Sequence, residues 1–258
     1  MSKITVKTYV ICLGNRKQNP KNINSWVDTF ADLVHFKAVD GKTVDLTDRD
    51  IVHSYANIAI QTKEKNETVF AVPSRGAIGC FLSHYKLWKK IASSKEPAIV
   101  MEEDVYITTE TKEKLQTALE NMKHEIPDHD FVSLMYISQP HSEKKSQHFL
   151  RINGPRSCGT QLYYLTPNGA EKLIKYALPI FTQPDLYIGT RCFDDSTFHA
   201  YCLKERLYSI MSIVADNFKS SIQGNFTVKK YLPRSNKFFY TIFACLFVCI
   251  ILIIIMMS

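Results

Sequence analysis

The sequence predicts an α/β fold in which a mixed sheet is covered by helices on both faces, followed by one C-terminal transmembrane helix. Three observations support this prediction. Segments rich in β-branched and aromatic residues alternate with segments whose apolar residues recur every three or four positions. Ala98–Met101 is a short, wholly apolar run, which is typical of a central strand buried on both faces. Phe238–Met257 is apolar over its whole length and carries no charge.

Turn-forming residues bound the segments that have the composition of strands. A turn beginning at Gly14 follows the first of them, and Asp40-Gly41 closes the second. The predicted strands are Thr5–Leu13, Val34–Val39, Ala98–Met101, Phe131–Tyr136 and Gln161–Leu165. Ser138–Gly154 is long, polar and basic, so we expect it to be a mobile surface loop near a site.

Helical periodicity is clearest in Gly76–Ile91, which is followed by the helix breaker Glu96-Pro97. Its apolar stripe consists of Ile78, Leu82 (or Phe81), Tyr85, Trp88 and Ile91. Thr166-Pro167-Asn168 starts a later helix, with proline in the first turn. The other predicted helices are Ile23–Leu33 and Asp45–Ile60.

The composition fits one large α/β domain or two small ones. Of the 258 residues, roughly 237 remain without the apolar tail, and 45% of the chain is hydrophobic, which excludes a disordered protein. The formal net charge of +7 favours an anionic partner. Because the lysines are dispersed and no arginine-rich block occurs, we expect that this partner is not a nucleic acid.

The cysteines and the N-terminus both predict a reducing compartment. Five of the seven cysteines lie outside the apolar tail, at wide spacings and without a CxxC motif. This pattern argues against a disulfide framework and against a structural zinc site. The first residues also lack the apolar core of a signal peptide.

The apolar tail predicts a single-pass C-terminal membrane anchor. Twenty helical residues span about 30 Å, the thickness of the hydrocarbon layer. The alternative, a buried core helix, is seldom wholly apolar over this length. Basic residues precede the tail and none follows it, so the N-terminal domain is expected to face the cytosol. The basic residues are Lys229, Lys230, Arg234 and Lys237.

These features divide the chain into three predicted parts. Residues 1–215 form the α/β domain, residues 216–237 a basic juxtamembrane linker and residues 238–257 the transmembrane helix. The Lys-, Asn- and Ile-rich composition suggests an AT-rich genome such as that of a large virus. The membrane is therefore expected to be a viral or host internal one.

Three adjacent carboxylates follow the apolar run Ala98–Met101. Glu102 and Asp104 flank Glu103, so both can point to one side of an extended chain. In an open α/β sheet, ligands bind at the carboxyl ends of the central strands. Hard oxygen ligands suit Mn²⁺ or Mg²⁺, and such a cation could bridge a diphosphate. The alternative is a solvated acidic turn, and the local sequence does not decide between the two.

The chain resembles glycosyltransferase family 25, which contains lipooligosaccharide and collagen galactosyltransferases. The resemblance rests on two neighbouring segments, Arg75-Gly-Ala-Ile-Gly-Cys-Phe-Leu-Ser-His-Tyr-Lys-Leu-Trp-Lys-Lys90 and Ala98-Ile-Val-Met-Glu-Glu-Asp-Val105. Other family-like segments occur in the same order and cover about residues 5–190. They are Thr8–Leu13, Ala38–Gly41, Gly159–Ile174 and Pro184-Asp185. The sequence departs from the family pattern at Glu103, usually Asp, and at Ala77, often Glu.

The resemblance implies a GT-A fold, with a Rossmann-like mixed sheet, that binds a UDP-sugar with Mn²⁺ (or Mg²⁺). The implied metal ligands are Glu102 and Asp104, and Glu102 or Glu103 could contact the ribose. Each of the other implied donor-binding residues also has a structural alternative. Arg75 could instead form a surface ion pair, Gly76 and Gly79 could only allow helix entry, and His84 could be a satisfied core histidine.

The family enzymes invert the anomeric centre, which requires a carboxylate base that deprotonates the acceptor hydroxyl. Asp185 is the candidate for this base, and Asp195 with Asp194 is its competitor. Each of the three could instead cap a helix. We interpret Cys80 as a buried small hydrophobe.

The leading hypothesis is a metal-dependent inverting transfer of galactose or glucose from a UDP-sugar to a glycan, lipid or protein acceptor. One alternative is a catalytically inactive, tail-anchored adaptor that keeps the fold. Another is a different nucleotide-sugar or nucleotidyl enzyme that uses the same acidic strand end. Stabilisation by UDP with Mn²⁺ would separate the first from the second.

Overall fold

A computed structural model describes residues 2–14, 20–65, 74–136, 142–154, 159–205 and 207. The predicted linker and transmembrane helix lie outside these residues, as does the end of the predicted α/β domain. Within the described part of the chain, no helix is both long and apolar enough to cross a membrane.

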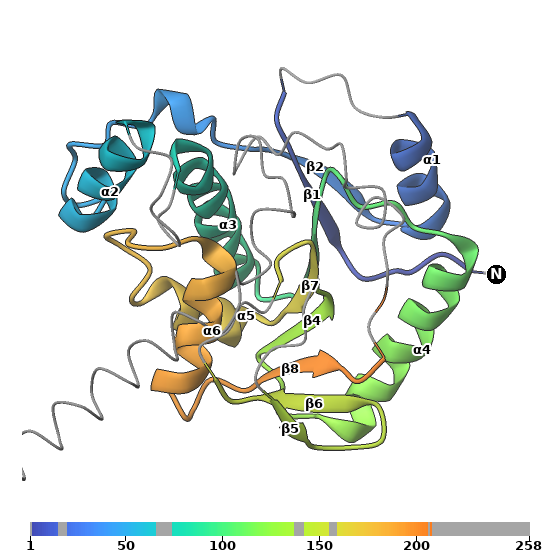
Figure 1. The fold of residues 1–258 in the computed structure, drawn as a ribbon. Helices are drawn as coiled ribbons and strands as arrows, with labels where there is room; N and C mark the ends of the chain where they lie inside the picture. Colours follow the sequence, from blue (N-terminus) through green and yellow to red (C-terminus); the bar gives the residue numbers. More distant parts are fainter. Residues whose placement is uncertain are drawn as a thin grey trace, which may run out of the picture.

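The described strands form one mixed sheet in the order β2-β1-β3-β7-β4-β8-β6-β5 (Figure 1). β1, β2 and β3 are parallel, and β7 then runs antiparallel between β3 and β4. β8 is parallel to β4, while β6 and β5 complete the sheet in antiparallel fashion. The strands are β1 Thr8–Cys12, β2 Leu33–Lys37, β3 Ala98–Glu102, β4 Phe131–Met135, β5 Ser142–Lys144, β6 Phe149–Ile152, β7 Leu162–Leu165 and β8 Ala200–Leu203.

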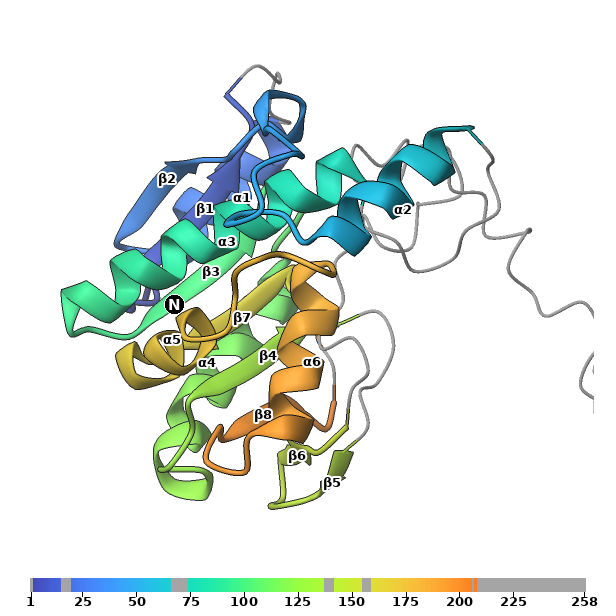
Figure 2. The ribbon, with the colours of Figure 1, turned by 90° about the vertical axis from the view of Figure 1, so that its left-hand side faces the viewer.

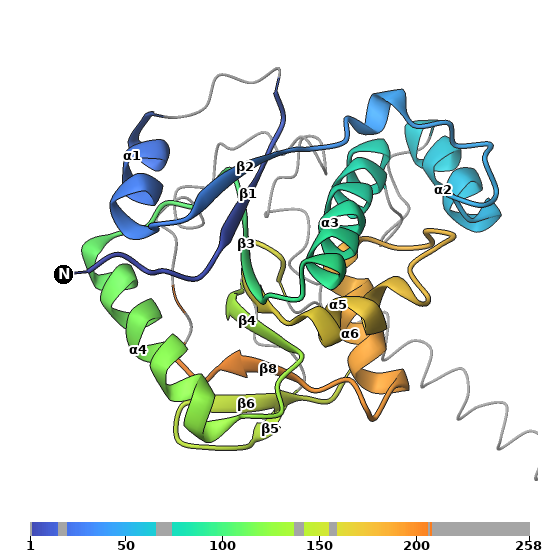
Figure 3. The ribbon, with the colours of Figure 1, turned by 180° about the vertical axis from the view of Figure 1, so that it is seen from behind.

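Helices cover both faces of this sheet, as predicted (Figures 1 and 3). One face carries α1 (Pro20–Thr29) and α4 (Thr109–Glu125). The other carries α3 (Arg75–Ser94), α5 (Pro167–Ile174) and α6 (Pro184–Asp194). α2 (Ser54–Lys65) lies beyond the start of α3, away from the sheet (Figure 2).

Each face of the sheet has its own hydrophobic core. Alternate residues of β1 point to opposite faces, so Tyr9 and Ile11 join the core under α3, whereas Val10 and Cys12 join the core under α4. β3 is buried on both faces, which confirms the prediction from its apolar run. The two cores therefore hold the end of β3 in place from both sides.

Two predicted elements are wrong. Asp45–Ile60 is not one helix, because α2 begins only at Ser54. The Asp45 and Asp48 side chains accept hydrogen bonds from backbone N–H groups two residues later, which favours turns over a helix. Ser138–Gly154 is not simply a loop either. Its described part contains the antiparallel hairpin of β5 and β6, and β6 is mostly buried against β8.

Three elements were not predicted. α4 is strongly charged, and only Leu115, Ala118 and Met122 show its buried face at helical spacing. β8 has only four residues, too few for a clear pattern. α6 follows Gln183 and has a proline in its first turn. It carries Asp185, so the position of that carboxylate depends on a helix that sequence periodicity did not reveal.

The topology brings several chain segments to the carboxyl end of β3. α3 returns to β3 through residues 95–97, so it runs antiparallel to the strand and its first turns lie beside the strand's end. β7 is antiparallel to β3, so its start lies there as well, and the backbone N–H of Glu102 donates to Gln161 O at 2.9 Å. These elements build the candidate site.

Candidate active site

Of the three consecutive carboxylates, Glu102 and Glu103 contact different parts of the structure. Glu102 ends the strand, and a turn follows in which Val105 N donates to Glu102 O at 3.2 Å. The Glu103 carboxylate turns back and accepts a hydrogen bond from the backbone N–H of Leu13 at 3.2 Å. Glu103 therefore satisfies a donor at the end of β1. This contact gives the residue a structural role beside the predicted contact with the donor.

Glu102 is a partly buried carboxylate held by two neighbours. Thr160, just before β7, donates a hydrogen bond from its hydroxyl to Glu102 Oε1 at 2.8 Å. His84 Nε2, on α3, lies 3.6 Å from the same oxygen. Burial alone would raise the pKa of Glu102, but the adjacent imidazole and the Thr160 hydroxyl outweigh it, so the pKa lies below its ordinary value. Glu102 is therefore ionised at neutral pH and available to a cation.

His84 is completely buried and belongs to a polar network within the core. Its Nδ1 lies 2.9 Å from the Tyr163 hydroxyl, which also accepts a hydrogen bond from Trp88 Nε1 at 3.0 Å. The network satisfies one ring nitrogen of His84 and leaves the other facing Glu102. His84 thus combines the two predicted alternatives, since it is anchored in the core and also faces the site.

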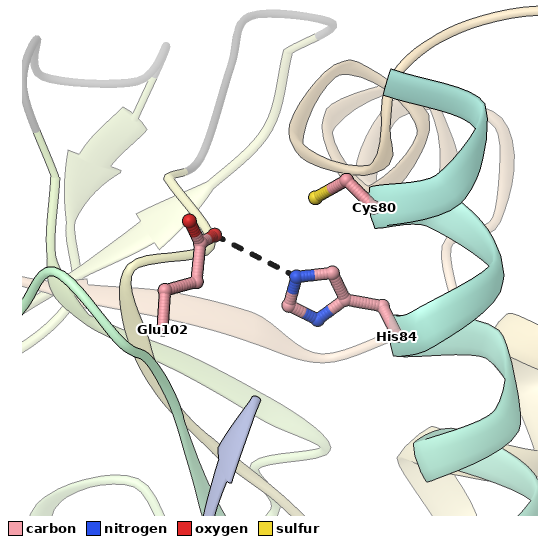
Figure 4. A group of neighbouring side chains, drawn as sticks. All are labelled: Cys80, His84 and Glu102. Atoms are coloured by element: carbon pink, nitrogen blue, oxygen red, sulfur yellow. Dashed lines mark ion pairs between the residues drawn. The ribbon is translucent and has the colours of Figure 1, made fainter. Parts of the chain in front are cut away.

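Cys80 lies one turn before His84 and points to the same place (Figure 4). Its sulfur, an imidazole nitrogen of His84 and a carboxylate oxygen of Glu102 lie within 4.8 Å of one another. Burial raises the pKa of the Cys80 thiol well above its ordinary value, and Glu102, Asp185 and Asp104 add to this effect. The charges of the two aspartates therefore act on this sulfur, whereas the ligand atoms that the structure groups closely are those of Cys80, His84 and Glu102.

Asp185 and Asp195 lie at opposite ends of α6. Asp185 is in the first turn, where the helix dipole favours a carboxylate. Asp195 follows the last turn, about 15 Å away by the helical rise. Its carboxylate accepts hydrogen bonds from Thr197 and pairs with Arg191 at 2.9 Å. The charge of Asp185 thus acts on Cys80, whereas Asp195 belongs to a local network at the far end of α6.

The predicted glycines mark a contact between two backbones. A Cβ on Gly79 would lie 2.5 Å from Gly41 N and 2.6 Å from Val39 O. A Cβ on Gly41 would lie 1.8 Å from Arg75 O and 3.1 Å from Gly76 N. The turn at Gly41–Thr43 therefore packs directly on the first turns of α3. The missing side chain of Gly79 therefore allows the protein's own backbone, at Val39 and Gly41, to lie close to α3.

Arg75 and Ser83 connect the same turn to α3. The Arg75 guanidinium donates to Val44 O at 3.4 Å. The Ser83 hydroxyl accepts from Val39 N at 2.8 Å and donates to Gly79 O at 2.7 Å. Ala77 is buried, and its N–H is capped by the Ser74 hydroxyl at 3.1 Å. Ser74 and Ala77 are the N-cap and N3 positions, so a Glu at 77 would complete a capping box.

The sequence matches the family description "Glycosyltransferase family 25 (LPS biosynthesis protein)" over residues 5–188, most of the chain. The chain belongs to glycosyltransferase family 25. The matched region of this family 25 protein contains β1, α3, β3 and the first turn of α6, and hence every element that contributes to the candidate site.

Several curated proteins are similar to this family 25 chain. Human procollagen galactosyltransferase 2 is 27% identical over 143 residues, which are 54% of this chain and 22% of that protein. Procollagen galactosyltransferase 1-B of Xenopus laevis is 32% identical over 39% of this chain and 17% of its own length. A glycosyltransferase 25 family member of Aedes aegypti is 30% identical over 45% and 19%, respectively. The chain thus spans about a fifth of these relatives.

Sequence reasoning missed two residues that shape the site of this family 25 protein. Thr160 holds Glu102, and Tyr163 holds His84, yet both had been noted only as part of a family-like segment. Their sequence signal is weak, because β7 is short and its pairing with β3 spans about sixty residues of chain. The interpretation of Cys80 as a buried small hydrophobe also misses a feature of the sequence. Its i, i+4 spacing to His84 places both side chains on one helix face.

The chemistry of the strand end fits a hard divalent cation. Glu102 is ionised, and the negative charges of Asp104 and Asp185 act on the neighbouring Cys80 thiol. Mg²⁺ and similar ions are bound in phosphate-handling sites by one or two carboxylates together with the substrate phosphates. The residues present at this edge therefore fit an ion that is held jointly by the protein and a nucleotide diphosphate.

Proposed function

We propose that this protein is a metal-dependent, inverting hexosyltransferase with a GT-A fold, which transfers galactose or glucose from a UDP-sugar to a glycan, lipid or protein acceptor. The observation that supports the proposal is the end of β3 within the family 25 region, where Thr160 and His84 hold the ionised Glu102 carboxylate. The names of the curated relatives, procollagen galactosyltransferases, support a hexose as the transferred group.

In this proposal Glu102 and Asp104 hold Mn²⁺ or Mg²⁺. When bound, the ion neutralises the charge that develops on the departing diphosphate. The lowered pKa of Glu102 supports this role, because the carboxylate needs no deprotonation before it binds a cation. Thr160 and His84 fix the Glu102 side chain from two sides, which reduces the entropy lost on binding.

Asp185 is the proposed base that takes the proton from the acceptor hydroxyl. It comes from a different element than the metal carboxylates, so it can approach the donor from another direction. Asp195 is the less favoured candidate, since its oxygens are already engaged by Thr197 and Arg191. Asp185 Oδ1 accepts a hydrogen bond from Leu186 N at 2.9 Å, which orients the carboxylate at the first turn of α6; a base also needs an acceptor hydroxyl within hydrogen-bond reach.

The proposal includes a membrane anchor at residues 238–257, with the catalytic domain on the cytosolic side. Support comes from the length of the apolar tail and from the basic residues that precede it. An anchor at this position would hold the site near a membrane surface and so favour membrane-bound acceptors.

The test is the thermal unfolding of the full-length chain with UDP, Mn²⁺, both or neither. We expect UDP with Mn²⁺ to raise the melting temperature, since a ligand at one hundred times its Kd adds about 2.7 kcal/mol. Asp104→Asn should abolish this shift. Asp50→Asn is the matched control, because it makes the same change at an exposed carboxylate in the turn before α2, and it should retain the shift.

If UDP with Mn²⁺ does not raise the melting temperature of the wild-type protein, the proposed enzymatic activity is contradicted and an inactive adaptor is favoured. If the shift occurs, release of hexose from UDP-galactose and from UDP-glucose identifies the donor. Release from neither sugar would point to a different nucleotide enzyme that uses the same strand end.

A further inference from the structure

We propose that Cys80, His84 and Glu102 form a binding site for Zn²⁺, with three protein ligands and a fourth position open to water or an oxygen ligand. A thiolate, an imidazole and a carboxylate are the donors that zinc accepts in proteins. Three protein ligands with an open position are typical of zinc sites that bind water or a substrate. This site differs from the oxygen-only pair proposed above for Mn²⁺, since it adds a soft sulfur ligand and a nitrogen ligand.

The fold brings the side chains of Cys80, His84 and Glu102 close together (Figure 4). Cys80 and His84 are four residues apart on α3, so both side chains leave the same face of the helix. Glu102 meets them from the end of β3. The ligand atoms lie within 4.8 Å of one another, and the nitrogen–oxygen distance is 3.6 Å. Zinc bond lengths imply ligand separations of about 3.3–3.6 Å in a tetrahedron, so only small side-chain rotations are needed.

One atom of this group is left unsatisfied without a cation. His84 Nε2 is fully buried and makes no hydrogen bond among the described residues, since its ion-pair contact with Glu102 Oε1, at 3.6 Å, is longer than a hydrogen bond. A buried polar group without a hydrogen-bond partner destabilises the folded protein. Because this nitrogen points toward Cys80 and Glu102, a metal ion between the three side chains would satisfy it (Figure 4).

The other ring nitrogen has the partner that a metal-binding histidine needs. Metal-bound histidines almost always use the second nitrogen for a hydrogen bond that orients the ring. Here Nδ1 lies 2.9 Å from the Tyr163 hydroxyl. The Trp88 indole can only donate, so the Tyr163 oxygen accepts from Trp88 and has a second lone pair for His84 Nδ1–H. In that tautomer the lone pair of Nε2 is directed to the metal.

The charge next to Cys80 favours a cation. An oxygen of the Glu102 carboxylate lies within 4.8 Å of the Cys80 sulfur, and this negative charge attracts a divalent ion to the same volume. On binding, the thiol loses its proton to the solvent, and the thiolate with ionised Glu102 balances the two charges of Zn²⁺. No oxidant or further ligand is required for this step.

The test uses Co²⁺ as a spectroscopic substitute for Zn²⁺, added to the full-length chain in detergent under reducing, anaerobic conditions. We expect a near-ultraviolet charge-transfer band from thiolate to cobalt, together with the intense visible bands of a tetrahedral ion. Zn²⁺ should bleach both. Cys80→Ser should abolish the charge-transfer band, and Glu102→Gln should lower cobalt affinity at least tenfold.

Matched variants separate this site from others. Cys12 also lies beside an imidazole, with its sulfur 3.6 Å from His35 Nδ1, so Cys12→Ser is the control for Cys80→Ser. Glu103→Gln is the control for Glu102→Gln. Tyr163→Phe should weaken zinc binding roughly ten- to hundredfold through the lost support of His84. Circular dichroism verifies that each variant is folded.

A missing charge-transfer band in the wild-type protein would overturn the zinc site, as would a band that persists in Cys80→Ser or disappears in Cys12→Ser. The experiment contains no nucleotide, so its outcome is independent of sugar transfer. A protein that is stabilised by UDP with Mn²⁺ but shows no cobalt band would lack only the zinc site.

Discussion

At the scale of single residues, neighbouring side chains of one type have different tasks. Glu102 faces the candidate site, whereas the Glu103 carboxylate bonds to the backbone of β1. The family resemblance implies that Gly79 binds the donor, but its missing side chain makes room for Gly41. The residue type indicates which chemistry a side chain can perform. Its contacts in the folded protein indicate which role it has.

The contact between Gly41 and Gly79 leads to a prediction about stability. In Gly79→Ala, the added Cβ would lie 2.5–2.8 Å from backbone atoms of Gly41. Alanine gains about 1 kcal/mol over glycine in a helix, but overpacking against anchored backbone costs about 1–3 kcal/mol or more. We expect a net loss of unfolding free energy of about 1–2 kcal/mol, measured by urea denaturation.

Gly14→Ala is the control for this substitution. A Cβ at Gly14 would meet no atom within 4 Å, and the change should leave the midpoint of the urea transition nearly unchanged. Equal destabilisation by both substitutions would show that close packing is not the cause.

At the scale of elements, α3 joins the two parts of the site. Its start packs on the turn at Gly41–Thr43, its second and third turns carry Cys80 and His84, and Trp88 anchors the network below them. The helix was predicted from its apolar stripe, which describes its buried face. The polar residues within that face, His84 and Ser83, are the ones that contact other elements through hydrogen bonds.

A second contact between elements predicts a pH effect. Glu125, at the end of α4, bonds to His148 in the turn between β5 and β6. Burial alone would raise the pKa of Glu125, but its hydrogen bonds with Ser146 and His148 hold it below the ordinary 4.5. Its stabilising contribution is therefore complete above about pH 4.5 and is lost as the pH falls through the lower, folded pKa.

In Glu125→Gln this part of the acid sensitivity should be absent. We expect the unfolding free energy of the variant to fall less steeply with acid than that of the wild type, as measured by urea titrations at a series of acidic pH values. Glu120→Gln, which changes an exposed carboxylate on the same helix, is the control and should keep the wild-type slope. Identical slopes for wild type and Glu125→Gln would contradict the prediction.

At the scale of the whole molecule, the sheet order assembles the candidate site. β1 and β3 end at the same edge, β7 begins there, and the first turns of α3 lie beside it (Figure 2). Residues from about position 80 to position 160 thus meet in one small volume. The apolar tail lies outside the described residues, and its role remains a prediction from composition and length.

Removal of the tail tests the membrane anchor. A chain that ends at residue 237 should move from the membrane fraction to the supernatant in a flotation experiment, because it loses about 30 Å of apolar helix. In intact vesicles with the cytosolic side outward, protease should digest the N-terminal domain of the full-length protein. Protection of that domain would reverse the predicted orientation, with lysed vesicles as the control for protease activity.

The sequence alone determined the local features of this protein. The apolar run of β3, the periodicity of α3 and the proline at the start of α5 are all encoded within about twenty residues, so their physical cause is visible in the pattern. The acidic strand end was likewise recognisable, because a buried strand that runs into carboxylates needs compensation.

Only the tertiary structure decided which residues meet. The first part of Asp45–Ile60, residues 45–53, forms turns because aspartate side chains compete for backbone N–H groups. Residues 142–152 form a hairpin whose strand β6 pairs with β8. The association of Cys80 and His84 with Glu102 and Thr160 crosses three elements. Such contacts depend on strand order and helix direction, which leave no periodic signal in the chain.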